Sequence, residues 1–596
     1  MSTSTSSQHS PRKISGYAAS YIAPIDGLRA LAVCAVLLYH LGVKWIPGGF
    51  LGVDLFFVIS GYVITRLILD SINSANALDL RAFYRARVRR LYPALLLLLI
   101  VTSLLILAFA PDGIHRFVED LPYVLTGTNN WHLVALHQDY FQINGRPPLL
   151  QHTWSLAVEL QFYIVWPIIL YFIWKRFGKR NIAPIALLIA VGSGIALFVN
   201  SLRLDHASAS RISHVYFGTD THSLGLFIGS ALAVSWIPAN LSSSISQRAQ
   251  DFIDGVGLVG IFGIVATFLY ISESNATLYR IAFPLAALFG SLTIASLVHP
   301  ASRFARFFSA KPLLWIGQRS YGIYLWHWVI FQMTRPSIDL AASSLLALNI
   351  ARFLLVLVAA DISLRYFELP FRRGVVENWL RGIKYRNRAL AKRQRIFVGV
   401  VVSLALLIPV GASFGSELRA ASIKYVFHQD FTLQQNKPVA NDKGLWVIGD
   451  SIILGSRYKL DARSHIALIN ARVGRQIQEL TDVARTEQPQ MANSTTVLDL
   501  GNNNHLTSDS VVTLLEILKG QPKVVLVNTS VPRSWKDDNN RIIAQISTQY
   551  PNVRLVDWAS ISNNHPEFFG PDGVHLSDQG SDVYVSAIMD ALTSTN

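Results

Sequence analysis

The sequence predicts a two-domain protein, in which a multi-pass α-helical membrane domain of about eleven spans precedes an α/β domain with a parallel sheet. Hydrophobic residues make up 51% of the 596 residues and charged residues only 15%, against roughly 25% charged in ordinary soluble domains. Nearly all the long apolar runs lie in 22–415, whereas 445–596 has the composition of a soluble domain. Residues 1–21 are expected to form a polar cytoplasmic tail, and 416–444 a polar linker between the domains.

The membrane spans follow from the apolar runs and the charges between them. A bilayer core takes about 20 apolar residues per helical span, and eleven segments are candidates, centred near residues 33, 60, 100, 164, 190, 229, 263, 290, 327, 353 and 405. The tail has no apolar core of the kind that a cleavable signal peptide requires, so the first span is expected to act as the insertion signal. Basic residues gather in loops such as 71–90 and 365–395 and are sparse in the alternate loops. This asymmetry places the N-terminus in the cytoplasm and, with an odd number of spans, 445–596 outside it, in a protein of the cell membrane.

The overall charge and the cysteine content exclude several other classes of protein. The net charge is +15, but the basic residues are spread through short loops rather than pooled in one domain, so we expect no nucleic-acid partner. Cys34 is the only cysteine, so the chain can form no internal disulfide, and cysteine-based metal sites are excluded. We expect no bound metal and no bound cofactor.

After the linker, the pattern changes to short apolar runs that alternate with amphipathic stretches long enough for helices. The expected strands are 445–448, 466–469, 495–500, 523–527 and 553–556. This alternation is typical of a parallel sheet with crossover helices on both faces. Polar residues that directly follow such strands lie at the edge where open α/β sheets bind their ligands.

Polar segments at that edge, or in a loop near it, together predict a serine nucleophile site. Ser451 follows the first strand in Gly-Asp-Ser, a tripeptide that suits either a nucleophile or a helix cap. Asp572 and His575, three residues apart, are spaced to supply an orienting carboxylate and a base. Asn503, after the third strand, and Gly474, after the second, are expected to bind the oxyanion. Because each pattern also occurs in ordinary turns, the prediction depends on their combination.

Ionisable side chains within the spans are the second set of candidates, because such groups are costly in a membrane and usually functional. Arg29 and His40 lie nearly on one face of the first span and about 16 Å apart along it. Arg29 also fits simple snorkelling to the cytoplasmic surface, and His40 also fits a structural interfacial histidine. Asp54 and Glu159 are explained as well by structural ion pairs as by function.

In this arrangement 445–596 resembles the SGNH hydrolase superfamily, with Ser451, Gly474, Asn503 and His575 at its four named positions. The resemblance sharpens to the extracytoplasmic domain of peptidoglycan O-acetyltransferases, through the segments KVVLVNTSVPRSW, YPNVRLVDW and PDGVHL. In the segment that contains the site asparagine, that family usually has Gly-Thr-Asn-Gly. This chain has Gly-Asn-Asn-Asn there, at 501–504. Asn503 stays in register with the family asparagine.

The apolar region is similar over its whole length to the acyltransferase-3 family, membrane proteins that carry acyl groups to extracytoplasmic acceptors. The matching segments are PIDGLRALAVCAVLLYH, GGFLGVDLFFVISGYVIT, FYRARVRRLYPA, TWSLAVELQFY, YFGTDTHSL and RSYGIYLWHW. The resemblance implies that His40 is the family's essential histidine and that Arg29 is its partner. It also implies that Arg87 and Arg90 handle an acyl-coenzyme A donor, whose phosphates suit arginine geometry.

This chain departs from the acyltransferase-3 pattern at two places. The family commonly has two consecutive acids where this chain has Glu159 and Leu160, so only Glu159 is assigned to donor handling. It commonly has an arginine where this chain has His222. If that arginine takes part in donor binding, another group must replace it here.

Together the resemblances imply a two-stage O-acetyl transfer across the membrane. The membrane domain would take acetyl from cytoplasmic acetyl-CoA, with His40 as base or relay. Ser451 would then be acylated outside, and His575 would deprotonate an acceptor hydroxyl, with peptidoglycan at the muramoyl 6-hydroxyl as the implied acceptor. The alternatives are O-acetylation of an O-antigen or another surface polysaccharide, a membrane-anchored carbohydrate O-acetyl esterase, and a transporter of lipid-linked glycans. Eleven spans with buried arginine and histidine are more than the anchor of an esterase needs.

Overall fold

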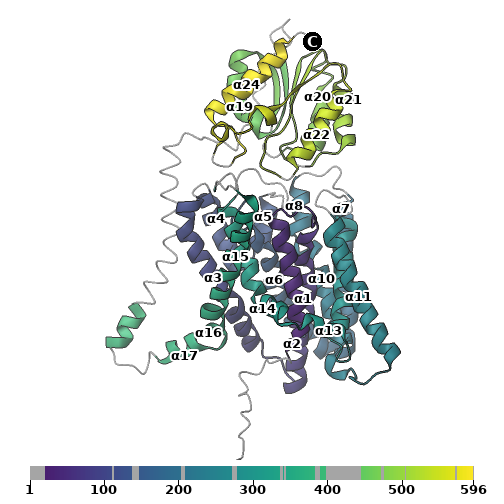
Figure 1. Ribbon diagram of the computed structural model, residues 1–596. Helices are drawn as coiled ribbons and strands as arrows, with labels where there is room; N and C mark the ends of the chain where they lie inside the picture. Colours follow the sequence, from purple (N-terminus) through teal and green to yellow (C-terminus); the bar gives the residue numbers. More distant parts are fainter. Residues whose placement is uncertain are drawn as a thin grey trace, which may run out of the picture.

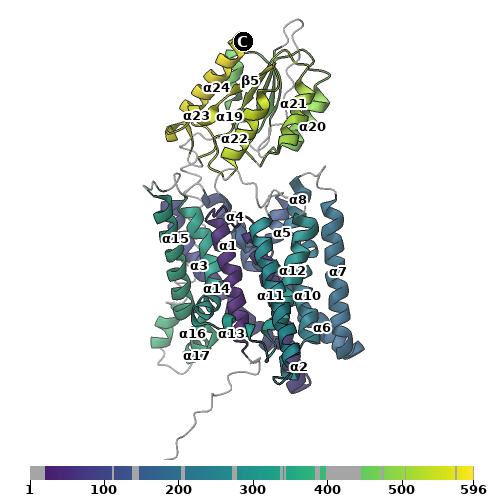
Figure 2. The same cartoon turned by 45° about the vertical axis from the view of Figure 1, so that its right-hand side comes forward.

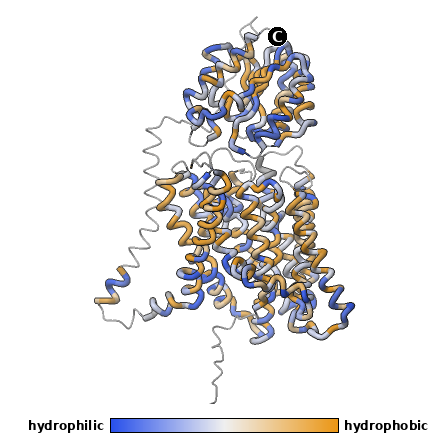
Figure 3. The backbone as a smooth tube through the Cα atoms, viewed as in Figure 1, coloured by the Kyte–Doolittle hydropathy of each residue, from blue (hydrophilic) through white to orange (hydrophobic). Residues whose placement is uncertain are grey.

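The computed structural model describes the chain in two domains, a bundle of helices and a smaller α/β domain that holds the C-terminus (Figure 1). The described residues are 21–110, 113–136, 147–202, 209–271, 278–335, 340, 344–382, 389–396, 444–471, 475–503, 505–533, 535–570 and 573–594. Apolar residues dominate the helical domain, whereas they alternate with polar residues in the α/β domain (Figure 3). Nearly all of the expected tail and linker, and the expected span near residue 405, lie outside the described residues.

The helical domain is built from long helices joined by short ones, and Figure 2 shows most of the long ones running nearly side by side. Its α-helices are α1 (Ala23–His40), α2 (Gly52–Ala75), α3 (Leu80–Phe109), α4 (Ile114–Thr126), α5 (Asn129–Ala135), α6 (Trp154–Phe177), α7 (Ile182–Ser201), α8 (Ala209–Phe217), α9 (Thr219–His222), α10 (Leu224–Ser235), α11 (Gln247–Tyr270), α12 (Phe283–Leu297), α13 (Phe304–Phe308), α14 (Lys311–Met333), α15 (Leu345–Ile362), α16 (Leu369–Arg372) and α17 (Val375–Gly382). Large apolar side chains face outward on α7, α11 and α15, as expected for helices that contact lipid.

Among the described residues, eight helical segments are long and apolar enough to cross a membrane. They are Ala23–His40, Gly49–Ser74, Leu80–Phe109, Gln151–Phe177, Lys179–Ser201, Gln247–Tyr270, Arg280–Leu297 and Leu345–Arg372. The expected span near 229 corresponds to a shorter apolar segment, Leu224–Asn240. The expected span near 327 corresponds to α14, which is not one of the eight. The multi-pass helical domain is therefore confirmed, and the count of eleven spans is not.

Close helix crossings hold α1 and α2 in place, because glycines let the backbones approach. A Cβ atom on Gly317 of α14 would lie 1.8 Å from the Asp26 carbonyl oxygen of α1. A Cβ atom on Gly61 of α2 would lie 1.9 Å from the Leu226 carbonyl oxygen of α10. No side chain fits at either crossing, so these glycines fix the positions of the polar residues that α1 and α2 carry.

The α/β domain has a five-stranded sheet in the order β2-β1-β3-β4-β5, with every neighbouring pair parallel. Its strands are β1 (Leu445–Gly449), β2 (Ile466–Ala471), β3 (Thr496–Asp499), β4 (Val524–Val527) and β5 (Val553–Val556), close to the expected ranges. The expected parallel sheet is confirmed. The order brings the carboxyl ends of β1 and β3 side by side, although β2 lies between them in the sequence.

Helices cover both faces of the sheet, as the alternating pattern predicts (Figure 1). One buried core joins the sheet to α19 (Ser451–Arg463) and α24 (Asp578–Thr593). A second core joins the opposite face to α20 (Ile477–Glu487), α21 (Ser508–Leu518) and α22 (Lys536–Ser547). The short helix α23 (Trp558–Ile561) follows β5. This layering leaves the loops after the strands to form the site.

Candidate active sites in the two domains

A cavity of about 570 Å³ lies within the helical domain and is rich in arginine. Its arginines are Arg29, Arg66, Arg87, Arg90 and Arg372. Three of these were singled out in the sequence, together with Glu159, which also lines the cavity. Arg66 and Arg372 were not, because Arg66 lies within an apolar span and Arg372 was counted only as a loop charge. The fold thus brings basic residues from four separate segments to one space.

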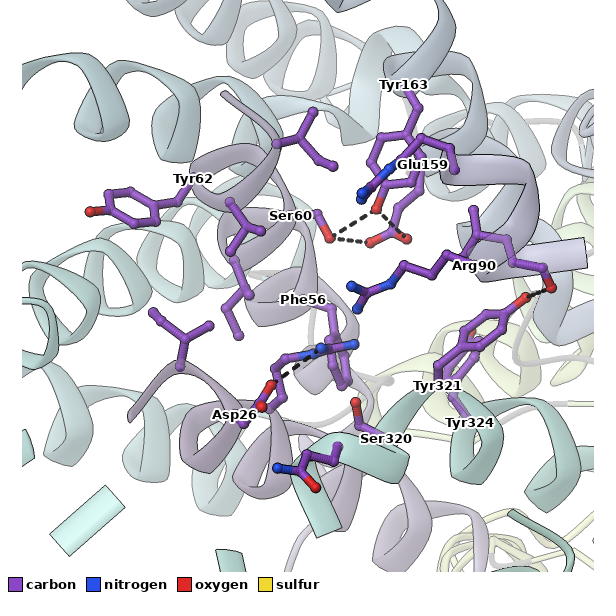
Figure 4. A pocket seen from close by; sticks show the side chains of 18 of the residues that line it. Asp26, Phe56, Ser60, Tyr62, Arg90, Glu159, Tyr163, Ser320, Tyr321 and Tyr324 are labelled. Atoms are coloured by element: carbon purple, nitrogen blue, oxygen red, sulfur yellow. Dashed lines mark hydrogen bonds and ion pairs between the residues drawn. The ribbon is translucent and has the colours of Figure 1, made fainter. Parts of the chain in front are cut away.

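Acidic and hydroxyl groups balance part of this charge inside the cavity. Glu159 accepts hydrogen bonds from the Ser60 hydroxyl at 2.6 Å and from the Tyr163 hydroxyl at 3.2 Å. These three side chains face one another in Figure 4, and Arg90 reaches toward the same space. Arg29 forms an ion pair with Asp26 at 3.4 Å. Two acids and five arginines are among the described residues that line the cavity, and Asp70 pairs with Arg66 from outside the lining. Positive groups still outnumber negative ones, which favours an anionic ligand.

His40 is not among the described residues that line the cavity, but a chain of hydrogen bonds connects it to the cavity wall. Its Nδ1 lies 3.2 Å from Nε2 of His327, and His327 Nδ1 lies 2.6 Å from the Tyr324 carbonyl oxygen. Tyr324 lines the cavity. Because a carbonyl oxygen only accepts, His327 Nδ1 carries the proton, its Nε2 accepts, and His40 donates from Nδ1. This tautomer leaves Nε2 as the basic nitrogen of His40.

The structure explains the departure at His222. Its Nε2 lies 3.0 Å from Oδ1 of Asp54, and both side chains are buried. The rings of Trp154 and Phe283 pack edge-on against the imidazole. His222 therefore gives the buried Asp54 carboxyl a polar partner, and neither residue is among those that line the arginine-rich cavity.

In the α/β domain, Ser451 is the first residue of α19 and follows the carboxyl end of β1. Asp450 is the N-cap of this helix, where its Oδ1 accepts a hydrogen bond from the Ile452 backbone N–H at 2.9 Å. Asp450 thus caps the helix, which leaves the neighbouring Ser451 side chain available as the candidate nucleophile. The position of Ser451 at a strand end is that expected of a nucleophile in an open α/β sheet.

The loop after β3 places Asn502 and Asn503 close to Asp450. Gly501 opens this loop with a φ of +99°, a conformation that disfavours other residues. Asn503 Nδ2 donates to Asp450 Oδ2 at 2.7 Å and to the Arg475 carbonyl oxygen at 3.2 Å. Both amide hydrogens of Asn503 are therefore engaged, and one of these bonds must be released before this amide can hold an oxyanion.

His575 lies in the loop that leads into α24, where its carbonyl oxygen accepts the Gly570 N–H at 2.7 Å. Burial raises the pKa of the Asp450 carboxyl above its usual value, and the nearby His575 acts against this rise. Its neighbour Val574 packs in the same buried core as Ile452 and Ile453 of α19, so His575 lies on the Ser451 side of the sheet. Asp572 and Gly474, the expected orienting acid and oxyanion glycine, lie outside the described residues, as does Asn504.

Comparisons with known proteins agree with this two-part architecture. The acyltransferase domain of the acyltransferase-3 family matches residues 22–362. Peptidoglycan O-acetyltransferase OatA of Listeria monocytogenes is 32% identical over 626 residues, which cover 97% of this chain and 99% of the relative. O-acetyltransferase OatA of Staphylococcus aureus is 32% identical over 598 residues, or 96% of each chain.

Among solved structures, the C-terminal catalytic domain of Streptococcus pneumoniae peptidoglycan O-acetyltransferase A, with a methylsulfonyl adduct, is 23% identical. That match has a TM-score of 0.23 and covers 25% of this chain and 92% of the other. The family assignment comes instead from the matched domain and the full-length relatives. The chain belongs to the acyltransferase-3 family, and it is a membrane O-acyltransferase.

Proposed function

We propose that this protein moves acetyl groups from cytoplasmic acetyl-CoA to hydroxyls of extracytoplasmic peptidoglycan, through an acyl-enzyme on Ser451. The observation that carries the proposal is the pairing, on one chain, of an arginine-rich cavity in the helical domain with a serine at a strand end. An esterase held by a simple anchor needs no such cavity.

The cavity supports acetyl-CoA as the donor. Its arginines present fixed, planar groups that suit the phosphates of coenzyme A. They include Arg87 and Arg90 of α3, which belong to the basic segment 71–90 that the positive-inside pattern assigns to the cytoplasm. In the relay role, Nε2 of His40 attacks the acetyl carbonyl, the bond to the sulfur of coenzyme A breaks, and the imidazole proton leaves with coenzyme A as its thiol. The acetylated His40 is then the carrier that presents the acetyl group to Ser451.

The second stage takes place in the α/β domain. The Ser451 hydroxyl attacks the acetyl carbonyl presented by the membrane domain, His575 takes its proton, and the carrier leaves with that proton. The acceptor hydroxyl then attacks the Ser451 ester, gives its proton to His575, and the proton returns to the serine oxygen. These steps follow the serine–histidine logic of nucleophilic catalysis.

The identity of the acceptor is supported by the relatives, one of which is named for peptidoglycan. An α/β domain outside the cytoplasm, as the loop charges indicate, has access to the cell wall. The glycan hydroxyl must occupy the place that water takes in a hydrolase.

The first experiment traps the acyl-enzyme in membranes that contain the full-length chain. Acetyl-CoA labelled in the acetyl group, supplied without glycan, should label the α/β domain at Ser451. Ser451→Ala should abolish that label, whereas Ser594→Ala, at an exposed serine of the same domain, should retain it. Undiminished labelling of Ser451→Ala would rule out this acyl-enzyme.

A further inference from the structure

Two buried aspartates meet beneath the serine site. Asp450 follows β1 and Asp499 ends β3, and these strands are neighbours in the sheet. A Cβ atom on Gly449 would lie only 3.0 Å from the Asp499 Cβ, so the two strand ends are in close contact. Asp450 is 2% exposed and Asp499 is 1% exposed. Neither carboxyl has access to bulk water.

One amide bridges the pair. Asn502 Nδ2 donates to Asp450 Oδ2 and to Asp499 Oδ1, each at 3.0 Å. The second oxygen of Asp499, Oδ2, is buried and accepts no ordinary hydrogen bond from an N–H or O–H group of the described residues, and the Tyr584 hydroxyl on α24 likewise lacks an ordinary partner among them. The side chains of Asp499 and Asp450 are within hydrogen-bonding contact of each other. Burying an ionised carboxylate whose oxygen accepts no ordinary hydrogen bond costs free energy. A protonated carboxyl instead carries an O–H group that can donate a hydrogen bond.

The surrounding charges do not neutralise two anions. The charge of His575 lowers the pKa of Asp450, against the larger effect of burial. Arg475, a buried cation nearby, donates hydrogen bonds to the carbonyl oxygens of Gly449 and Asn470. Tyr584, which faces Asp499, remains a neutral phenol because burial raises its pKa well above the usual value. The groups that act most strongly on Asp499 include no cation.

The titration of the pair follows from this geometry. Burial, and then the charge of Asp450, raise the pKa of Asp499 well above its usual range. The Asn502 amide and the Ile453 backbone N–H act in the opposite direction without reversing this shift. Two carboxyls in contact rarely ionise together, because like charges at short range repel strongly.

We propose that Asp499 is a positioning residue of the serine site, and that it stays a neutral acid which donates its proton to Asp450. Asp450 then remains the single anion of the pair. It holds the amides of Asn502 and Asn503, and it stabilises the positive charge that His575 gains when it takes a proton. The inference rests on the proposed role of Ser451 and His575, and the pair itself exchanges no proton during turnover.

The first test compares two variants of Asp499 in the full-length chain, by Ser451-dependent hydrolysis of an activated acetyl ester. Asp499→Asn replaces the neutral carboxyl O–H donor with a neutral amide N–H donor, so this variant should keep most of the ester turnover. Asp499→Leu removes the donor and should lower kcat by about ten- to a hundredfold, the cost of one hydrogen bond to a charged group, with little change in KM. Equal damage in both variants, or none in Asp499→Leu, would overturn the proposal.

The second test needs no activity and separates a proton effect from simple misfolding. A carboxyl whose pKa is raised on folding binds a proton that the unfolded chain releases near pH 4, so stability falls as pH rises from there to the native pKa. The urea midpoint of the α/β domain, read from amide-exchange protection of β3, should fall over this window in the unaltered chain. In Asp499→Asn the fall should be smaller, whereas Asp482→Asn, at an exposed aspartate of α20, should follow the unaltered chain.

The outcomes distinguish this inference from the proposed function. If Asp499→Asn and the unaltered chain lose stability in parallel, Asp499 is ionised and the inference fails, whatever Ser451 does. If Ser451→Ala still cleaves the ester, the proposed acyl-enzyme fails, while the stability measurement still reports on Asp499.

Discussion

At the scale of single residues, His327 helps to set the tautomer of His40, the residue that the proposed function uses as base or relay. The Tyr324 carbonyl fixes the proton of His327 on Nδ1, and this in turn makes His40 donate from its own Nδ1. The arrangement parallels an orienting carboxylate in a catalytic triad, with a neutral imidazole in its place. His327 lies within the segment RSYGIYLWHW, but nothing in the sequence marks it as a partner of a residue 287 positions away.

His327→Leu should therefore reduce transfer from labelled acetyl-CoA by about ten- to a hundredfold, because His40 loses its side-chain acceptor and keeps only the backbone of Val36 to orient it as it becomes charged. His327→Gln should retain more activity, since its side-chain carbonyl can accept the same hydrogen bond. His214→Gln, at a histidine that pairs instead with Asp220 on α9, is the matched control. Full activity of His327→Leu would show that His40 needs no orientation from this residue.

The residues of the serine site were predictable to the extent that the chain itself places them. Ser451 and Asn503 lie within a few residues of the ends of β1 and β3, so a parallel sheet brings them to one edge. The contact between Asp450 and Asp499 was not predictable, because it depends on β3 pairing with β1, and strand order is a property of the whole sheet. Arg66 and Arg372 were missed for the same reason, since only tertiary packing gathers them.

At the scale of secondary structure, the crossing of α2 and α10 depends on glycine. Gly61→Ala would place a methyl group 1.9 Å from a backbone oxygen that cannot move aside alone, so it should destabilise the helical domain by at least about 1–3 kcal/mol. Gly192→Ala on α7, where a Cβ meets nothing within 4 Å, is the control and should be neutral or stabilising. The measurement is the thermal midpoint of the full-length chain in detergent.

Ester hydrolysis by Ser451 should survive Gly61→Ala, because the serine site lies in the other domain. A midpoint equal to that of Gly192→Ala would contradict the close crossing of α2 and α10.

The elements that the sequence predicted well are those whose patterns are local. The strands β1, β3 and β4 are short runs that are buried throughout, the edge strands β2 and β5 are partly buried, and the long spans are continuous apolar stretches. The region between the third and fourth spans was treated only as a loop, yet it contains α4 and α5. Their packing buries Asp120 completely, 2.9 Å from Arg116 and 3.3 Å from His132. The amphipathic periodicity of α4 was the signal that could have revealed it.

At the scale of the whole molecule, the proposed function divides one reaction between two domains. The helical domain has an arginine-rich cavity, to which the proposal assigns the anionic thioester donor, and the α/β domain has a serine at a strand end, to which it assigns the acyl-enzyme. Neither site completes the transfer alone in this account. The central claim of the proposed function is therefore that the acetyl donor and the glycan acceptor are used on opposite sides of the membrane.

The most direct test uses sealed vesicles that contain the full-length chain in one known orientation. Labelled acetyl-CoA is supplied on the side opposite the α/β domain, and a peptidoglycan fragment on the side of that domain. The account predicts labelled O-acetyl glycan in this arrangement only, and none when acetyl-CoA is confined to the side of the α/β domain. Equal product with donor and acceptor together on that side would contradict transfer across the membrane.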